Sequence, residues 1–384
     1  MKAIVNGTLL LPGADVSGKA LLYDETIRGM ADVQEAQWLA DEIIDAEGLY
    51  VAPGLIDVHI HGYGGWDVSD GDPAAVRRMA HCLLQNGVTG FLPTTLTIPW
   101  AQLQAICEAM RGLAAESRRA DFSGAEILGV HLEGPFINPA RKGAQNPAFI
   151  LPPQAEKILP YADIVKILTL APEMPGAAEC IQTLRRETGI ALSMGHTGAS
   201  FEEAMAAVDW GVTRATHLFN AMTPMTHRQP GASGAALVSD VYTELIADTF
   251  HVHRGLFPLL ARLKGSRLVL ITDALRAAGM PDGEYENGGQ RFLLKGIECR
   301  LPDGTIAGSV LRLNQAVKNL RDWGGVSLNE AVHAASLNAA ASARLAARKG
   351  SLEEGKDADI ILMDEACQVY RTIVRGTCKY CASL

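Results

Sequence analysis

In the stretch GLIDVHIHGYGG, residues 54–65, an apolar run typical of a buried strand ends in two histidines and several glycines. Side chains two positions apart on a β-strand point to the same face, so His59 and His61 share one face of the expected strand. Two neutral imidazoles on one face can bind a single cation. Taken alone, the stretch fits equally well two ordinary histidines that each make a hydrogen bond.

Beyond this stretch, short apolar runs alternate with helical patterns. Seven further strand-like runs follow, among them EILGVHLEG (126–134) and RLVLITDA (267–274), and helical patterns separate most of them. Repeated strand–helix units favour a parallel sheet covered by helices, and eight such strands predict an α/β fold of the closed (β/α)₈ TIM barrel type. An open doubly wound sheet is the alternative, but no G-x-G-x-x-G motif follows the first strand.

The two ends of the chain are rich in strand-forming residues. Runs such as AIVNGTLLL (3–11) and DADIILMD (357–364) alternate with turns and lack long helical patterns. We therefore expect residues 1–52 and 344–384 to form one small β-sandwich domain built from both termini. Residues 53–343 would form the barrel.

Composition excludes several classes of protein. The 43 acidic and 34 basic residues give a formal net charge of −9, which argues against nucleic acid as a partner. No apolar stretch reaches the roughly 18 residues of a membrane span, and MKAIVNGTLLLPG has no apolar core long enough for a secretory signal. The seven scattered cysteines fit a reducing compartment, so we expect a cytoplasmic protein. Cys378 and Cys381 are interpreted as a local pair of packed thiols rather than a zinc or redox site.

The side chains that could carry chemistry gather at the ends of the predicted strands. The carboxyl ends of barrel strands meet on one face, where barrel active sites are built. Imidazole and carboxylate ligands suit Zn²⁺ or Fe²⁺, and a spare carboxylate can take a proton from water. This pattern predicts a metal-assisted hydrolase, whereas His81, His131 and His333 are interpreted as structural or surface residues. The residues at strand ends are His59, His61, Glu133, His196, His217, His251, His253 and Asp273.

Several separate motifs resemble those of the N-acetylglucosamine-6-phosphate deacetylases of the amidohydrolase superfamily. The resemblance extends over nearly the whole chain, and its most diagnostic stretches are HLEGPFINPARKGAQNP (131–147) and THLFNAMTPMTHRQPG (216–231). The supporting motifs are PGLIDVHIHG (53–62), GHT (195–197) and TDA (272–274). The resemblance implies hydrolysis of the acetamide of N-acetyl-D-glucosamine 6-phosphate to D-glucosamine 6-phosphate and acetate.

The resemblance also implies a metal centre of one or two ions per chain. Glu133, His196 and His217 would hold the principal divalent metal, Zn²⁺ or Fe²⁺, and His59 and His61 would hold a second. Many amidohydrolases bridge two metals through a carboxylated lysine. Lys166 lies inside its predicted strand rather than at the end, so Glu133 is the better bridge.

The same resemblance implies residue roles in catalysis and substrate binding. Asp273 would accept a proton from the attacking water and then pass it to the departing amine. Arg228 would reach the sugar phosphate across the interface of a homodimer. Some family members carry histidine where this chain has Gln145, whose amide can donate a hydrogen bond but cannot carry a proton charge. The substrate-binding residues implied are Ala144, Gln145, Asn220, Ala221, Arg228, His251, Ile306, Ala307 and Gly308.

Three alternatives stay open at this point. A deacetylase for N-acetyl-D-galactosamine 6-phosphate would use the same chemistry, and no residue reads out the one hydroxyl that distinguishes the two sugars. A cyclic-amide hydrolase would be indicated by a carboxylated Lys166. A scaffold without activity would be expected to lack the metal ligands, which are all present here.

Overall fold

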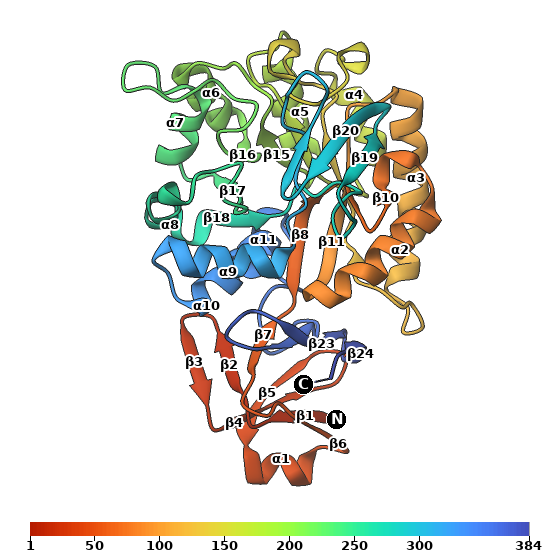
Figure 1. The fold of residues 1–384 in the computed structure, drawn as a ribbon, viewed down its shortest axis with the longest axis vertical. Helices are drawn as coiled ribbons and strands as arrows, with labels where there is room; N and C mark the ends of the chain where they lie inside the picture. The colour runs from red at the N-terminus through yellow and green to blue at the C-terminus, as the bar shows by residue number, and fades with distance from the viewer. Residues whose placement is uncertain (384) are drawn as a thin grey trace.

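The computed structural model describes residues 1–383, and eight parallel strands form its centre (Figure 1). Neighbouring strands pair in chain order from β8 to β18, so the barrel topology is confirmed. Backbone hydrogen bonds from Asp273 to His59 and from His61 to Ala274, both 2.9 Å, join the last strand to the first. The strands are β8 (Leu55–Ile60), β11 (Val88–Thr95), β13 (Val130–Glu133), β14 (Val165–Leu170), β15 (Ala191–Met194), β16 (Val212–Ala215), β17 (Tyr242–Ile246) and β18 (Leu268–Ile271).

Helices surround the barrel because the outward-facing side chains of the strands are largely apolar and need cover. Their apolar sides pack with the strands into one continuous core, which includes Phe91, Leu168 and Leu270. No helix within residues 1–383 is both long and apolar enough to span a membrane. The helices are α2 (Pro73–Leu83), α3 (Trp100–Ser117), α4 (Ala155–Ile158), α5 (Ala177–Glu187), α6 (Phe201–Trp210), α7 (Gly231–Val238), α8 (Phe257–Lys264), α9 (Leu313–Gly324), α10 (Leu328–Ala334) and α11 (Leu337–Ser342).

Both ends of the chain build a small β domain at the lower end of the view in Figure 1. One sheet has the order β5-β4-β1-β6, and the other has the order β24-β23-β22-β7-β2-β3. The second sheet joins the two halves of the sequence, because β7 pairs with both β2 and β22. The elements are β1 (Lys2–Val5), β2 (Thr8–Leu11), β3 (Ala14–Ser17), β4 (Lys19–Tyr23), β5 (Ile27–Asp32), α1 (Val33–Leu39), β6 (Glu42–Asp45), β7 (Tyr50–Pro53), β22 (Ile360–Met363), β23 (Val369–Val374) and β24 (Thr377–Cys381).

This domain confirms the prediction that the termini fold together, while the boundaries at residues 52 and 344 stay a prediction. The thiols of Cys378 and Cys381 are exposed on β24 rather than packed, because β24 is the edge strand of its sheet.

A buried ion cluster connects the small domain to the barrel. The Lys349 ammonium lies 2.6 Å from Glu126, 2.9 Å from Asp357 and 2.6 Å from Asp359. Lys349 has no exposed surface, and Arg348 also contacts Glu126. Burial by itself raises the pKa of Glu126, but Lys349 and Arg348 outweigh it and lower the pKa to about 2.

A three-stranded antiparallel sheet follows β18 and lies beside the mouth of the barrel (Figure 1). Its strands are β19 (Gly283–Asn287), β20 (Gln290–Lys295) and β21 (Glu298–Arg300). The sequence analysis did not predict this sheet, although Gly288-Gly289, the two residues between β19 and β20, is a hairpin signal. Its inner side packs Phe292 and Leu294 against Leu275. Three shorter strands complete the fold: β9 (Gly62–Tyr63), β10 (Trp66–Asp67) and β12 (Glu126–Ile127).

Candidate active site

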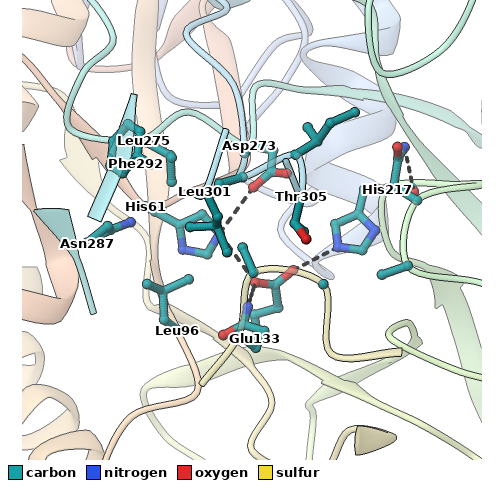
Figure 2. A pocket seen from close by; sticks show the side chains of 18 of the residues that line it. His61, Leu96, Glu133, His217, Asp273, Leu275, Asn287, Phe292, Leu301 and Thr305 are labelled. Atoms are coloured by element: carbon teal, nitrogen blue, oxygen red, sulfur yellow. Dashed lines mark hydrogen bonds and ion pairs between the residues drawn. The ribbon is translucent and has the colours of Figure 1, made fainter. Parts of the chain in front are cut away.

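Four imidazoles converge on the carboxylate of Glu133 at the carboxyl ends of the strands. Figure 2 shows His61, His217 and Asp273 arranged around Glu133. The Nε2 atoms of His59, His196 and His217 lie 3.3, 3.2 and 2.9 Å from Glu133 Oε1. The Nε2 atom of His61 lies 3.3 Å from the other oxygen, Oε2. The five residues predicted as metal ligands therefore form one cluster.

The orientation of three of these imidazoles is set by a hydrogen bond at the other ring nitrogen. Carbonyl and carboxylate oxygens can only accept, so Nδ1 carries the proton and the lone pair of Nε2 faces Glu133. This is the arrangement that a metal-binding histidine requires. The bonds join His59 to Glu244 (2.9 Å), His61 to the Thr94 carbonyl (3.1 Å) and His196 to the Arg141 carbonyl (3.0 Å).

Glu244 lies beneath the cluster and was not predicted as a site residue. It is fully buried in β17, where it contacts His59, the backbone N–H of His217 and the guanidinium of Arg214. Burial alone would raise the pKa of Glu244, but His59 and Arg214 hold it well below its usual value. Glu244, ionised at neutral pH, therefore supports the tautomer of His59. The signal that the sequence offered for this pair was a charged residue, Arg214 or Glu244, within each of two predicted barrel strands.

The donor set fits divalent cations. The buried Nε2 of His59 has no hydrogen-bond partner in residues 1–383, as expected for an atom that binds an ion. Two groups of ligand atoms around Glu133 are each close enough to share one ion: His59 with His61, and His196 with His217. Imidazole and carboxylate together are typical ligands of Zn²⁺ and Fe²⁺. Burial would raise the pKa of Glu133, but the imidazoles of His59 and His196 keep it well below its usual value.

Lys166 takes no part in this cluster. Its ammonium group donates to the Asp163 carbonyl at 2.7 Å, before β14 begins and away from the carboxyl end of that strand. His131 is a buried core residue whose ring bonds the Val58 carbonyl and the Thr169 hydroxyl. These placements agree with the expectations for both residues.

Asp273 follows β18 and faces the histidines. Its Oδ1 lies 3.1 Å from His61 Nε2 and 3.5 Å from His59 Nε2. Burial would raise the pKa of Asp273, but the neighbouring imidazoles of His59 and His61 lower it. Its φ of 52° lies in the left-handed region, as do those of His196 (48°) and His217 (28°). Strained backbone of this kind is concentrated at functional sites. Here it occurs at three residues whose side chains face the mouth of the barrel.

A cavity of about 330 Å³ opens beside the cluster. The structure brings together eight of the nine predicted substrate-binding residues along its wall: Ala144, Gln145, Asn220, Ala221, His251, Ile306, Ala307 and Gly308. His251 lies in the loop after β17, five residues beyond the strand end rather than at it. Burial would lower the pKa of His251, but the hydrogen bond and charge of Asp248 outweigh it and raise the pKa. His253, by contrast, is exposed.

Arg228 is the predicted residue that the structure does not bring to the cavity. It lies in an exposed loop with Met225 and His227. Among the residues described, no arginine or lysine lines the cavity. A phosphate bound there would meet no guanidinium or ammonium group from the described residues of this wall.

Two wall residues change the expectations from sequence. The amide of Gln145 is already engaged: its Oε1 accepts from the Thr97 N–H at 2.7 Å and its Nε2 donates to Glu133 Oε2 at 2.5 Å. Asn287, which was not predicted, extends from the end of β19 toward the cavity (Figure 2). Neither polar atom of its side chain has a partner within residues 1–383.

The profile of the amidohydrolase family matches residues 50–379. This chain belongs to the amidohydrolase family. The amidohydrolase is 42% identical to the N-acetylglucosamine-6-phosphate deacetylase of Bacillus subtilis (strain 168), over 85% of this chain and 84% of the relative. It is 36% identical to the N-acetylgalactosamine-6-phosphate deacetylase of Escherichia coli O157:H7, over 86% and 88%. The crystal structure of N-acetylglucosamine-6-phosphate deacetylase from Pasteurella multocida superimposes with a TM-score of 0.92 at 29% identity, covering 99% of each chain.

Proposed function

We propose that this amidohydrolase hydrolyses the acetamide of N-acetyl-D-glucosamine 6-phosphate to D-glucosamine 6-phosphate and acetate. The observation that carries the proposal is the Glu133 carboxylate within 3.3 Å of four imidazole nitrogens, with Asp273 beside two of them. The 42% identity to the Bacillus subtilis deacetylase supports the same substrate.

Glu133, His196 and His217 would hold the principal cation, and His59 and His61 would hold a second one against the same carboxylate. Zn²⁺ and Fe²⁺ both suit these ligands. A cation bound there would polarise the acetamide carbonyl and lower the pKa of water toward about 7.

Asp273 moves the proton in this proposal. Its lowered pKa keeps the carboxylate ionised at neutral pH, so that it can accept a proton from the water that attacks the acetamide. The same oxygen would then pass the proton to the amine nitrogen as the C–N bond breaks. Oδ1 lies within 3.5 Å of the Nε2 atoms of His61 and His59, so Asp273 stands beside the cation that these two nitrogens would hold.

The sugar would be held by the cavity wall and the phosphate by a second copy of the chain. His251, Asn220 and the backbone of residues 306–308 are suited to the sugar hydroxyls. Arg228 would reach the phosphate of the other copy in a homodimer, because no arginine or lysine among the described residues lines the cavity of its own chain. A guanidinium fits two phosphate oxygens at once. Exposed Met225 and Val238, close to Arg228 in sequence, are suited to burial in such an interface.

The protein would act in the cytoplasm, where phosphorylated sugars are found. We also propose residues 1–52 and 344–384 as the bounds of the small domain.

The second candidate substrate is N-acetyl-D-galactosamine 6-phosphate. The chain is 36% identical to the Escherichia coli enzyme for that sugar and 42% identical to the Bacillus subtilis enzyme for the gluco compound, so the gluco compound is favoured.

The test is release of free amine from both 6-phosphates by protein reconstituted with Zn²⁺ or Fe²⁺, with metal counted per chain. We expect a higher kcat/KM for the gluco compound. A higher kcat/KM for the galacto compound would make that sugar the substrate. If metal-loaded protein deacetylates neither sugar phosphate, the proposed function is rejected.

A further inference from the structure

Gln145 connects the loop after β11 to the centre of the metal cluster. Its side chain is 4% exposed and reaches Thr97 with one end of the amide and Glu133 with the other. Thr97 also donates its hydroxyl to the backbone carbonyl of Glu133 at 3.3 Å. The loop and Glu133 are therefore joined through both side chain and backbone.

The orientation of this amide follows from its partners. A backbone N–H can only donate, so the oxygen of Gln145 must face Thr97 and the NH₂ group must face Glu133. An ionised carboxylate can only accept, so the second contact is a charge-assisted hydrogen bond from Gln145. A flipped amide would lose both bonds at a buried site.

This bond makes the two oxygens of Glu133 different. Oε1 faces the Nε2 atoms of His59, His196 and His217. Oε2 faces His61 at 3.3 Å and Gln145 at 2.5 Å. Without Gln145, the carboxylate could rotate about its last torsion, since terminal sp² groups have broad torsional wells. With it, Oε2 is held toward His61, and Oε1 is held toward the other three imidazoles, so the carboxylate reaches both histidine pairs.

We infer that Gln145 is a positioning residue, whose hydrogen bond to Glu133 Oε2 holds the carboxylate in the orientation that serves both metal sites at once. This inference rests on the proposed metal centre. It replaces the expectation that the Gln145 amide binds the substrate, because its oxygen and one N–H already have partners. Loss of this bond is therefore expected to weaken cation binding rather than sugar binding.

The test compares Gln145→Met with a matched control, Gln290→Met. Methionine keeps the length and volume of glutamine but donates no hydrogen bond. Gln290 also lines the cavity and donates its amide to the Ala144 carbonyl, but it makes no hydrogen bond to Glu133. Each apoprotein is titrated with Zn²⁺ against a competing chelator. We expect Gln145→Met to bind Zn²⁺ about 10- to 100-fold more weakly than wild type, and Gln290→Met to bind it as wild type does.

A kinetic measurement separates positioning from substrate contact. If Gln145 acts through Glu133, the lost activity of Gln145→Met returns at excess Zn²⁺ with an unchanged KM for the sugar. Wild-type Zn²⁺ affinity together with a raised KM would overturn the inference. Gln145→Leu is the second variant if the methionine protein does not fold, and the same affinity loss is expected. Because the readout is Zn²⁺ affinity, a wild-type protein that binds Zn²⁺ but deacetylates neither sugar would reject the proposed function without touching this inference.

Discussion

The Nδ1 atom of His59 lies 2.9 Å from Oε2 of Glu244, a carboxylate with no exposed surface. Glu244 also neutralises Arg214, which is fully buried in the neighbouring strand β16. One carboxylate therefore orients a metal-binding imidazole and compensates a buried cation. Removal of either function has a measurable consequence.

Glu244→Gln keeps the size of the side chain but removes its charge. We expect weaker Zn²⁺ binding, by about 10- to 100-fold, because the glutamine amide has one oxygen in place of two and cannot accept from both His59 and Arg214. We also expect a loss of about 3–5 kcal/mol in the free energy of unfolding, because Arg214 stays buried without its partner. Chelator competition and urea unfolding measure the two effects. If the variant has the Zn²⁺ affinity and the free energy of unfolding of wild type, the charge of Glu244 supports neither metal binding nor stability.

Asp273→Asn is expected to lower kcat by at least about 10²-fold while metal content stays near that of wild type, because an amide cannot accept the proton from water. Metal analysis and steady-state kinetics on the same preparation are the measurements. If metal is lost together with activity, Asp273 is a ligand rather than a base.

Arg228→Ala is expected to raise KM for the 6-phosphate far more than for the unphosphorylated sugar, because only the phosphate uses the guanidinium. An equal effect on both sugars would remove the phosphate role.

A mixture of Arg228→Ala and Asp273→Asn chains tests which copy supplies the arginine. Each mixed dimer would contain one site with both Asp273 and Arg228, so re-associated equal amounts should recover about a quarter of wild-type activity. No recovery after verified exchange of subunits would show that Arg228 acts within its own chain or not at all.

Acid stability is expected to depend on Glu126. Its pKa is lowered from 4.5 to about 2 in the folded chain, so its stabilising contribution is complete above pH 4.5 and is lost as the pH falls toward 2. This amounts to at most ~3 kcal/mol over that range. Urea unfolding between pH 5 and pH 3 should show a shallower decline for Glu126→Gln than for wild type. Glu116→Gln, which breaks an exposed pair with Arg77, serves as the control and should decline as wild type does.

The amino-acid sequence was enough to predict the barrel and the group of residues that meets at its mouth. Strand side chains alternate with a period of two, and the parallel strands of a barrel have their carboxyl ends on one face. These two rules were enough to predict that His59, His61, Glu133 and Asp273 lie close together. These are local properties of the chain, repeated strand by strand, and they need no knowledge of which distant residues touch.

The surroundings of these residues could not be predicted before the fold was known. Glu244 and Arg214 are ordinary charged residues in the sequence, and their role exists only because two neighbouring strands bury them against His59. The sequence did not indicate any hydrogen-bond partner for the Gln145 amide, whereas in the folded chain Thr97 and Glu133 lie on either side of it. The physical reason is that a hydrogen bond depends on atoms within about 3 Å, and residues distant along the chain reach that separation only when the barrel closes.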